Sequence, residues 1–135
     1  LLLAFALGAA MQELQTGPYI AGMISEALPL WAIAPMVFLA ACLISFTTGT
    51  SWGTFGILVP VAIPIALSTG LSPSLLLAAV MGGGVFGDHC SPISDSTVLS
   101  SLASGCDHLT HVKTQLPYAL LAGSASLVLF AVSGL

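Results

Sequence analysis

Apolar stretches alternate with short polar or glycine-rich interruptions along the whole chain. Residues 1–10 are apolar and are followed by the polar stretch MQELQTGPY, which indicates the end of one membrane helix. Residues 20–28 are weakly amphipathic and predict an interfacial segment. Residues 31–46 are apolar and uncharged, but they fall short of the roughly twenty residues that a clean membrane span needs.

A second short apolar run follows a polar tip. The tip, residues 47–54, reads TTGTSWGT, and the run at residues 55–67 contains Pro60 and Pro64, which remove helical hydrogen bonds. Two short apolar arms around a tip rich in glycine and hydroxyl groups predict a re-entrant helical hairpin over residues 30–67.

The next segment predicts a membrane helix that is broken in its middle. Ser72 can cap a helix and Pro73 suits its first turn, so a helix is expected from there to Phe86. It should break at GDHCSPISD, residues 87–95, and resume over about residues 94–103, which gives a discontinuous segment within residues 73–104. A polar loop is expected over residues 105–115, and residues 116–135 have the length of a complete span.

These two interruptions predict the architecture of a transporter. Lipid cannot satisfy free amide and carbonyl groups, so non-helical backbone at membrane depth must be buried in protein or line a watered cavity. The two breaks should therefore meet. Unwound segments that meet near the midplane are the arrangement in which secondary transporters hold an ion or substrate. We therefore expect an all-α, polytopic membrane protein, with residues 1–135 forming part of one transmembrane domain.

Composition supports this class and excludes another. Hydrophobic residues make up 57% of the 135 residues and charged residues only 4%, whereas soluble domains carry about a quarter as charges. Lys113 is the single cation, so the chain offers no basic surface for nucleic acid. Both ends fall within apolar sequence, and we expect a piece of a longer polypeptide in contact with lipid. Cys42, Cys90 and Cys106 show no spacing typical of a disulfide framework.

Two acids in the second break are the strongest candidates for a functional role. An ionised aspartate at the bilayer centre costs roughly 2.5–3.5 kcal/mol on insertion scales, so Asp88 and Asp95 are expected to face a cavity or a partner. With Lys113 as the only cation, they should be protonated or hold a metal ion. The structural alternative is a helix cap, most plausible for Asp95, because carboxylates favour helix N-termini.

The chemistry around these acids favours ion exchange. A dehydrated carboxylate binds either a proton or a sodium ion, and mutual exclusion at one site is enough for antiport. Hard cations prefer oxygen ligands. Hydroxyl oxygens are offered in the second break by Ser91, Ser94, Ser96 and Thr97, and at the first tip by Thr48, Thr50 and Ser51. Any of these hydroxyls could instead bond to the preceding helical turn or pack between helices.

Two other chemistries fit less well. The Cys and His residues are zinc ligand types, but they lack the paired spacing of zinc motifs, and a pH-sensitive or interfacial cluster is favoured for His108 and His111. The two aspartates could form the dyad of an intramembrane protease. Both belong to one break, however, instead of coming from two helices, so an enzyme is not expected.

Three long strings of this sequence resemble a known family. They are SFTTGTSWGTFGILVPVAIPIA at residues 45–66, GGGVFGDHCSPISDSTVLSS at residues 82–101 and CDHLTHVKTQLPYAL at residues 106–120. In this order they are similar to the NhaC-type sodium/proton antiporters of the ion transporter superfamily. The resemblance implies the C-terminal portion of a bacterial inner-membrane transporter with inverted repeats, whose N-terminal part would be the main partner, alongside lipid and a homo-oligomeric assembly.

The resemblance also carries expectations for individual residues. Na⁺ and H⁺ would be the transported ions, with no cofactor, and Asp88 and Asp95 would be the ligands that bind a proton or Na⁺. The remaining ion-binding residues would be Ser91, Ser96, Thr97, Thr48, Thr50 and Ser51, and the supporting residues Gly87, His89, Pro92, Gly49 and Trp52. Relatives with similar motifs exchange malate for lactate or move other organic ions, so an organic acid or amino acid antiporter is the alternative. A purely structural membrane segment is the alternative outside transport.

Overall fold

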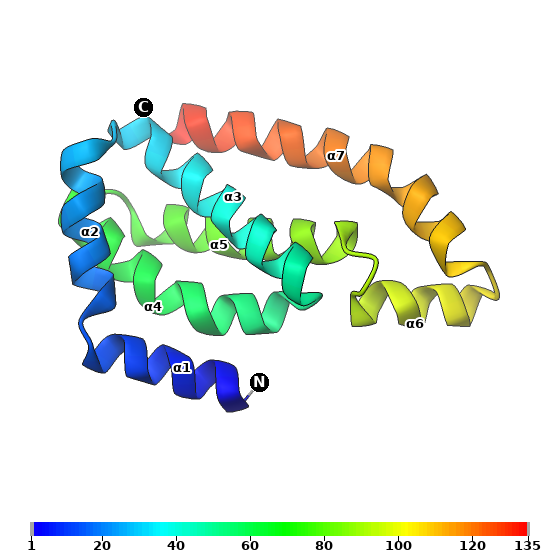
Figure 1. Cartoon of the computed structure of the whole chain (residues 1–135). Coiled ribbons are helices and arrows are strands. Elements are labelled where there is room, and N and C mark those ends of the chain that lie inside the picture. Colours follow the sequence, from blue (N-terminus) through cyan, green and yellow to red (C-terminus); the bar gives the residue numbers. More distant parts are fainter. Residues whose placement is uncertain (1, 135) are drawn as a thin grey trace.

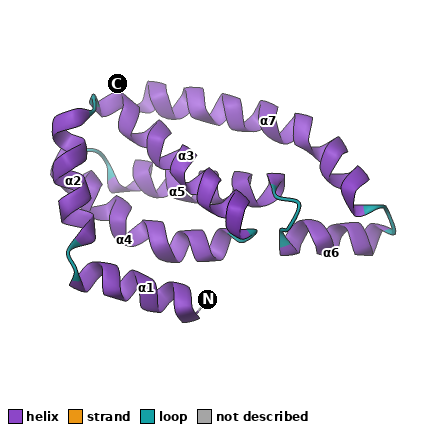
Figure 2. Cartoon of the chain, viewed as in Figure 1, coloured by secondary structure: helices purple, strands orange, loops and turns teal. Residues whose placement is uncertain are grey.

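The chain folds into helices joined by short loops. The computed structural model describes residues 2–134, leaving out the side chains of residues 4, 5 and 25–27. Within that range every regular element is a helix, as Figure 2 shows, so the prediction of an all-α chain is confirmed. The helices are α1 (Leu2–Glu13), α2 (Thr16–Ala27), α3 (Leu30–Thr48), α4 (Ser51–Thr69), α5 (Pro73–Cys90), α6 (Asp95–Ser104) and α7 (His108–Ser133).

Three of the described helices are long and apolar enough to cross a membrane, namely α3, α4 and α7. The predicted short arms of the hairpin were wrong in length, since α3 and α4 each contain 19 residues. Helix α4 continues through Pro60 and Pro64, which agrees with the tolerance of membrane helices for proline where neighbouring groups satisfy the backbone. Because each arm can span a bilayer, the re-entrant character of the hairpin stays a prediction, as does the inverted repeat.

The first two helices pack on α4 through glycines. Figure 1 shows α1 alongside α4 and α2 running across one end of it. A Cβ at Gly8 would lie 2.6 Å from the carbonyl oxygen of Gly56, and one at Gly17 would lie 2.9 Å from the side chain of Pro64. The expected interfacial segment at residues 20–28 falls mainly in α2, whose Ala21 is buried.

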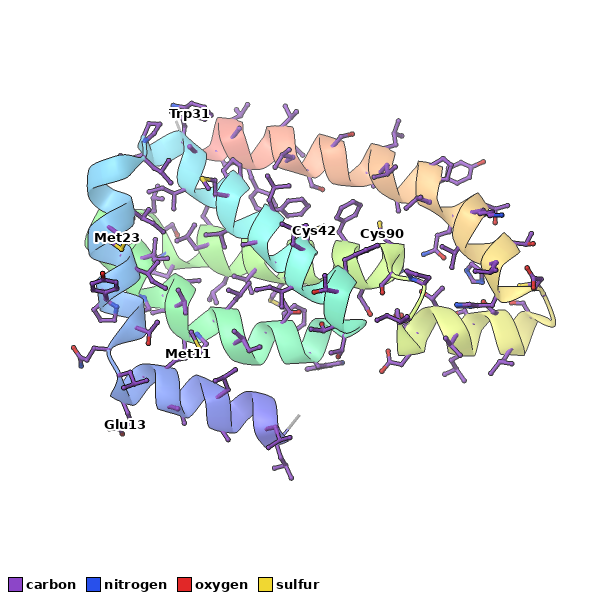
Figure 3. All side chains as sticks on the ribbon, in the orientation of Figure 1. Met11, Glu13, Met23, Trp31, Cys42 and Cys90 are labelled. Atoms are coloured by element: carbon purple, nitrogen blue, oxygen red, sulfur yellow. The ribbon has the colours of Figure 1, made fainter. Side chains whose placement is uncertain are left out.

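Helices α3 and α5 make the closest contact in the fold. A Cβ at Gly83 or Gly87 would clash with the backbone carbonyl of Phe38 or Cys42, respectively, so the two backbones touch at these points. Small residues four apart allow two helices to approach this closely. In membranes, van der Waals packing and not the hydrophobic effect drives the association of helices. Figure 3 shows Cys42 on α3 and Cys90 at the end of α5. Cys42, Cys90 and Cys106 are free cysteines in the structure.

Aromatic rings extend this contact to α7. The ring of Phe38 stacks on Phe86 of α5 with centroids 5.9 Å apart, and it packs against Phe130 of α7 at 5.4 Å. Helix α7 returns antiparallel to the broken helix and ends beside the start of α3, where a Cβ at Gly134 would lie 2.8 Å from Trp31 Cα. Helix α7 thus packs against α3 and α5, the helix that leads into the break, and its C-terminus contacts the start of α3.

Two predicted boundaries are wrong. The helix does not end at Phe86 but continues to Cys90, so the break between α5 and α6 is shorter than expected. The predicted loop over residues 105–115 is also too long, because α7 begins at His108. The physical reason is a cap: Asp107 Oδ2 accepts hydrogen bonds from the amide and the hydroxyl of Thr110, both at 2.9 Å.

Candidate functional site

The two breaks in the chain meet, as the sequence predicted. Gly49 lies between α3 and α4 with a φ of 69°, and a Cβ there would lie 2.8 Å from the carbonyl oxygen of Ile93 in the other break. Ser91 Oγ, at the end of α5, donates a hydrogen bond of 2.8 Å to the carbonyl oxygen of Phe46. The two loops face each other in Figure 2.

Asp88 lies beside this junction, in the last turn of α5. Its side chain is buried, with 7% of the residue exposed. Ser94 Oγ donates to Asp88 Oδ1 at 2.7 Å, and Ser96 Oγ donates to Asp88 Oδ2 at 3.3 Å. The two serine hydroxyls lie 2.8 Å from each other. A single carboxylate of α5 is therefore hydrogen-bonded to two hydroxyls from the start of the following half-helix. We call Asp88, Ser94 and Ser96 the Asp88 cluster.

Ser94 also begins that half-helix. Its Oγ accepts a hydrogen bond of 3.4 Å from the amide of Thr97, which makes it the N-cap of α6. The alternative in which Asp95 caps the helix is therefore wrong, because Asp95 is already the first helical residue. Its carboxylate still lies at the positive end of the α6 dipole, but the residue is exposed, and within residues 2–134 it makes no side-chain hydrogen bond.

The electrostatics at Asp88 favour a cation. Lys113, the only Lys or Arg in the sequence, forms no ion pair with Asp88 in the described part of the chain. Asp88 itself lies at the C-terminus of α5, where the helix dipole adds partial negative charge. The side-chain groups closest to it are hydroxyls, so the donors are all oxygen, which suits a hard cation such as Na⁺.

The structure distributes the other candidate hydroxyls unevenly. Ser91 is buried and donates to α3, and Thr97 is buried next to the cluster. Thr48 Oγ1 donates to the carbonyl of Ile44 at 2.8 Å, the bond to the preceding turn that the sequence left open as an alternative. Thr50 and Ser51 are half-buried at the start of α4.

The supporting candidates also separate into two groups. Gly87 lies in the contact of α5 with α3, and Pro92 lies in the break itself. His89 is exposed on the last turn of α5. Trp52 is 65% exposed and packs edge-on against Phe55, with ring centroids 6.0 Å apart. The aromatic contact of Trp52 thus lies within its own helix, α4.

A polar cavity adjoins the Asp88 cluster. Its volume is about 400 Å³, and it is lined by Ser96 and Thr97 from the first turn of α6. The remaining lining residues come from α5, α6 and α7, and they are His89, Ser100, His111 and Gln115. A hydrated ion could approach Ser96, and through it Asp88, from this side.

Within the described residues, the geometry favours neither a metal centre nor a serine nucleophile. Among the described residues, no three His, Cys, Asp or Glu side chains converge on one metal position, although Cys106 Sγ lies 3.9 Å from His111 Nδ1. The stretch GTSWG at residues 49–53 has the spacing of a hydrolase nucleophile elbow. That motif requires a strand before the turn, whereas here it follows α3 and opens α4.

Sequence reasoning missed or underrated three residues. Ser94 was one of several possible oxygen ligands, yet it both caps α6 and contacts Asp88. A serine just ahead of a helix is a capping signal. Ser101 and His108 were not expected near the break, and no local pattern could place them there, because their contacts depend on how α7 packs.

Comparisons with known proteins agree on one family. The profile of the Na⁺/H⁺ antiporter family matches residues 1–135. The malate-2H⁺/Na⁺-lactate antiporter of Bacillus subtilis is 40% identical over 126 residues, covering 87% of this chain and 27% of the relative. The arginine/ornithine antiporter ArcD of Halobacterium salinarum is 32% identical over 135 residues, covering 100% of this chain and 28% of that protein.

A further relative carries the family's ion specificity in its name. The Na⁺/H⁺ antiporter NhaC of Alkalihalophilus pseudofirmus is 29% identical over 106 residues, covering 78% of this chain and 23% of that protein. The chain thus spans about a quarter of the length of these relatives. No solved structure shows a significant match.

Proposed function

This chain belongs to the Na⁺/H⁺ antiporter family, and from that premise we propose that the complete protein exchanges Na⁺ for H⁺ through the carboxylate of Asp88. One observation carries the proposal: a buried carboxylate with two hydroxyl partners and no cationic partner among the described residues lies where two helix breaks meet. A carboxyl group can hold a proton when neutral and a cation when ionised, so one group of this kind can carry either ion.

The exchange follows from competition at one carboxylate. When Asp88 is ionised, its charge and the hydroxyl oxygens of Ser94 and Ser96 bind Na⁺, because a hydroxyl can turn its lone pairs toward a cation. When a proton occupies the carboxyl group, the negative charge that attracts Na⁺ is gone. Binding of one ion thus releases the other, which couples the two fluxes.

Other candidate ligands complete the proposed shell. Ser91, Thr97, Thr50 and Ser51 and the carbonyls of both breaks supply further oxygens. Asp95 would be the second ionisable ligand, and it would act from the exposed start of α6 together with the rest of the transporter. The inner membrane of a bacterium is the proposed location, and the remaining part of the same polypeptide is the proposed partner.

Alternating access would move both breaks together. Ser91 and Gly49 hold the α3–α4 tip against the α5–α6 break, and backbone contact joins α3 to α5. These helices would therefore shift as one body against the remainder of the transporter, so that the same site faces each side of the membrane in turn.

An organic-ion antiporter is the second candidate function. The names of the relatives from Bacillus subtilis and Halobacterium salinarum, a malate/lactate and an arginine/ornithine antiporter, favour it. In that case Asp88 would still hold the coupling ion. Stimulation of exchange by a dicarboxylic acid or an amino acid, and its absence with Na⁺ alone, would distinguish this function from simple Na⁺/H⁺ antiport.

The test uses the complete parent protein in everted vesicles. An acid interior is established, NaCl is added, and the pH gradient is followed by fluorescence. We expect Na⁺ to collapse the gradient in the wild type and not in Asp88→Asn or Asp95→Asn, with normal membrane insertion of both. Asp107→Asn is the matched control, because Asp107 is an exposed acid outside the cluster. Wild-type exchange in both site variants would contradict the assignment.

A further inference from the structure

Helix α7 reaches the broken helix with a hydrogen bond to the break itself. His108 Nε2 lies 2.6 Å from the carbonyl oxygen of Pro92. A carbonyl oxygen can only accept, so Nε2 must carry the hydrogen and donate it. Pro92 belongs to the segment between α5 and α6, sixteen residues earlier in the chain. His108, in the first turn of α7, thus donates to the carbonyl of Pro92, which lies between two helices and is paired within neither.

The same face of α7 makes a second contact of this kind. Gln115 Nε2 donates a hydrogen bond of 3.1 Å to the carbonyl oxygen of His89, in the last turn of α5. His108 and Gln115 are seven residues apart, so they lie on one face of the helix, two turns from each other. Helix α7 therefore donates to carbonyls on both sides of Ser91, the residue that follows α5 and forms its C-cap.

His108 also connects the break to α6. Its Nδ1 lies 3.1 Å from Ser101 Oγ, and Ser101 is buried, with 2% exposed. Ser101 Oγ is 2.8 Å from the carbonyl oxygen of Thr97 and 2.9 Å from Nδ1 of His111. One imidazole ring thus bridges the unwound segment and the second half-helix.

We propose that His108 and Gln115 are positioning residues for the ion site. They hold the carbonyls of Pro92 and His89, and so set the path of the chain from Asp88 to the hydroxyls of Ser94 and Ser96. Without these donors, the two carbonyls would turn to water in the adjoining polar cavity or to other groups, and the break would lose two contacts that fix its path. The inference rests on the proposed ion site at Asp88, but its structural part can be tested without transport.

The proposed role does not depend on the charge of His108. Nε2 carries a hydrogen both in the imidazolium and in the neutral Nε2–H tautomer, so the bond to Pro92 survives titration of the ring. An amide at the same position can therefore replace it. The Nε2 atom of a glutamine occupies nearly the place of the imidazole Nε2, whereas asparagine is one bond shorter and reaches only toward Ser101.

This difference defines the variants for the experiment. His108→Gln retains the donor to Pro92, and His108→Asn loses it. Gln115→Glu keeps the shape of the side chain but removes the donor to His89. His111→Asn is the matched control, since it removes an imidazole from the same cluster but keeps a donor toward Ser101, and His111 makes no bond to the break.

The first readout is hydrogen exchange of peptides covering residues 87–97 in the complete, detergent-purified protein. The amides of Ser91, Ser94 and Thr97 report on this segment, because they are bonded to Asp88 O, Ser91 O and Ser94 Oγ, respectively. We expect exchange to be about threefold to tenfold faster in His108→Asn and Gln115→Glu, the range for loss of one hydrogen bond. His108→Gln and His111→Asn should match the wild type, and peptides of α3 should be unchanged in all four variants.

The second readout is Na⁺-dependent exchange in vesicles. We expect the apparent KM for Na⁺ to rise in His108→Asn and Gln115→Glu by a similar factor, and the pH profile of His108→Gln to keep its wild-type position. Unchanged protection of residues 87–97 in His108→Asn would overturn the proposal, as would a His108→Gln variant as defective as His108→Asn. If the wild type fails to respond to Na⁺, the proposed function is wrong, while the hydrogen-exchange comparison still decides the positioning role.

Discussion

Replacing Gly49 by alanine in the complete transporter should push the α3–α4 tip away from the break between α5 and α6. Gly49 has a φ of 69°, a left-handed conformation that costs a residue with a Cβ roughly 1–2 kcal/mol. The new Cβ would also lie 2.8 Å from the carbonyl oxygen of Ile93, whereas ordinary van der Waals contacts begin at 3.4 Å. Tip and break must therefore separate by several tenths of an ångström.

Two other glycines allow the backbone cost to be measured separately. Gly70 and Gly105 have φ values of 75° and 63°, and no described atom lies within 4 Å of a Cβ built on either. Gly70→Ala and Gly105→Ala should therefore lose roughly 1–2 kcal/mol from the backbone alone. Gly49→Ala should add roughly 1–3 kcal/mol for overpacking. We expect about 2–5 kcal/mol in total for Gly49→Ala.

The assay combines thermal unfolding in detergent, at one scan rate, with Na⁺-driven collapse of a pH gradient in vesicles. All three variants should unfold at lower temperature, Gly49→Ala lowest. Only Gly49→Ala should also slow exchange, by about tenfold to a hundredfold, since a displacement near 1 Å can cost a hundredfold in rate. Equal stability and equal exchange in Gly49→Ala and Gly70→Ala would refute the reasoning that this contact matters.

Two further predictions concern the boundaries and packing of the helices. The amide and the hydroxyl of Thr110 both donate to Asp107 and hold the pKa of its carboxyl below the usual range. The charged carboxylate therefore stabilises the fold. This contribution should be complete above the ordinary pKa of about 3.9 and lost as the pH falls through the lowered value, and comparing melting temperatures of wild type and Asp107→Asn at neutral and acid pH would test it. Gly87→Ala should lower the melting temperature because its Cβ would clash with the Cys42 carbonyl. Gly82→Ala, with ordinary contacts of 3.7 Å or more, should raise the melting temperature, because the higher helix propensity of alanine adds about 1 kcal/mol to the free energy of unfolding. A stabilising Gly87→Ala would contradict the close contact of α3 and α5.

Local signals in the sequence account for much of the fold. Pro73 after Ser72 marks the start of α5, and Gly49 marks the end of α3, because proline suits a first turn and glycine suits the left-handed residue after a helix. The meeting of the two breaks also follows from a general requirement, since unpaired backbone groups cannot face lipid. These features depend on residues within one or two turns of each other, or on the membrane itself.

The remaining features depend on distant contacts. The sequence places Asp88 and Asp95 in one break, but the structure buries the first and exposes the second. This difference depends on how the end of α5 and the start of α6 are oriented in the fold. The polar residues at the start of α7 have the composition of a loop, and they become helical because Asp107 caps them and His108 finds Pro92. Such partners lie too far along the chain for a local pattern to identify them.

The hydrogen bonds between α3 and α5 impose an order of events on biosynthesis. Ser45 donates to the carbonyl of Gly84, 39 residues later, and Ser91 donates to the carbonyl of Phe46, 45 residues earlier. At about 5–20 residues per second, the ribosome needs roughly 2–9 s to supply the second partner of each bond. Until α5 is made, the hydroxyl of Ser45 and the carbonyl of Phe46 must therefore be paired with other groups. A nascent chain stalled before Gly84 carries the tip but lacks Asp88 and its two serine partners, so quality control can encounter an inserted chain whose two breaks have not yet met.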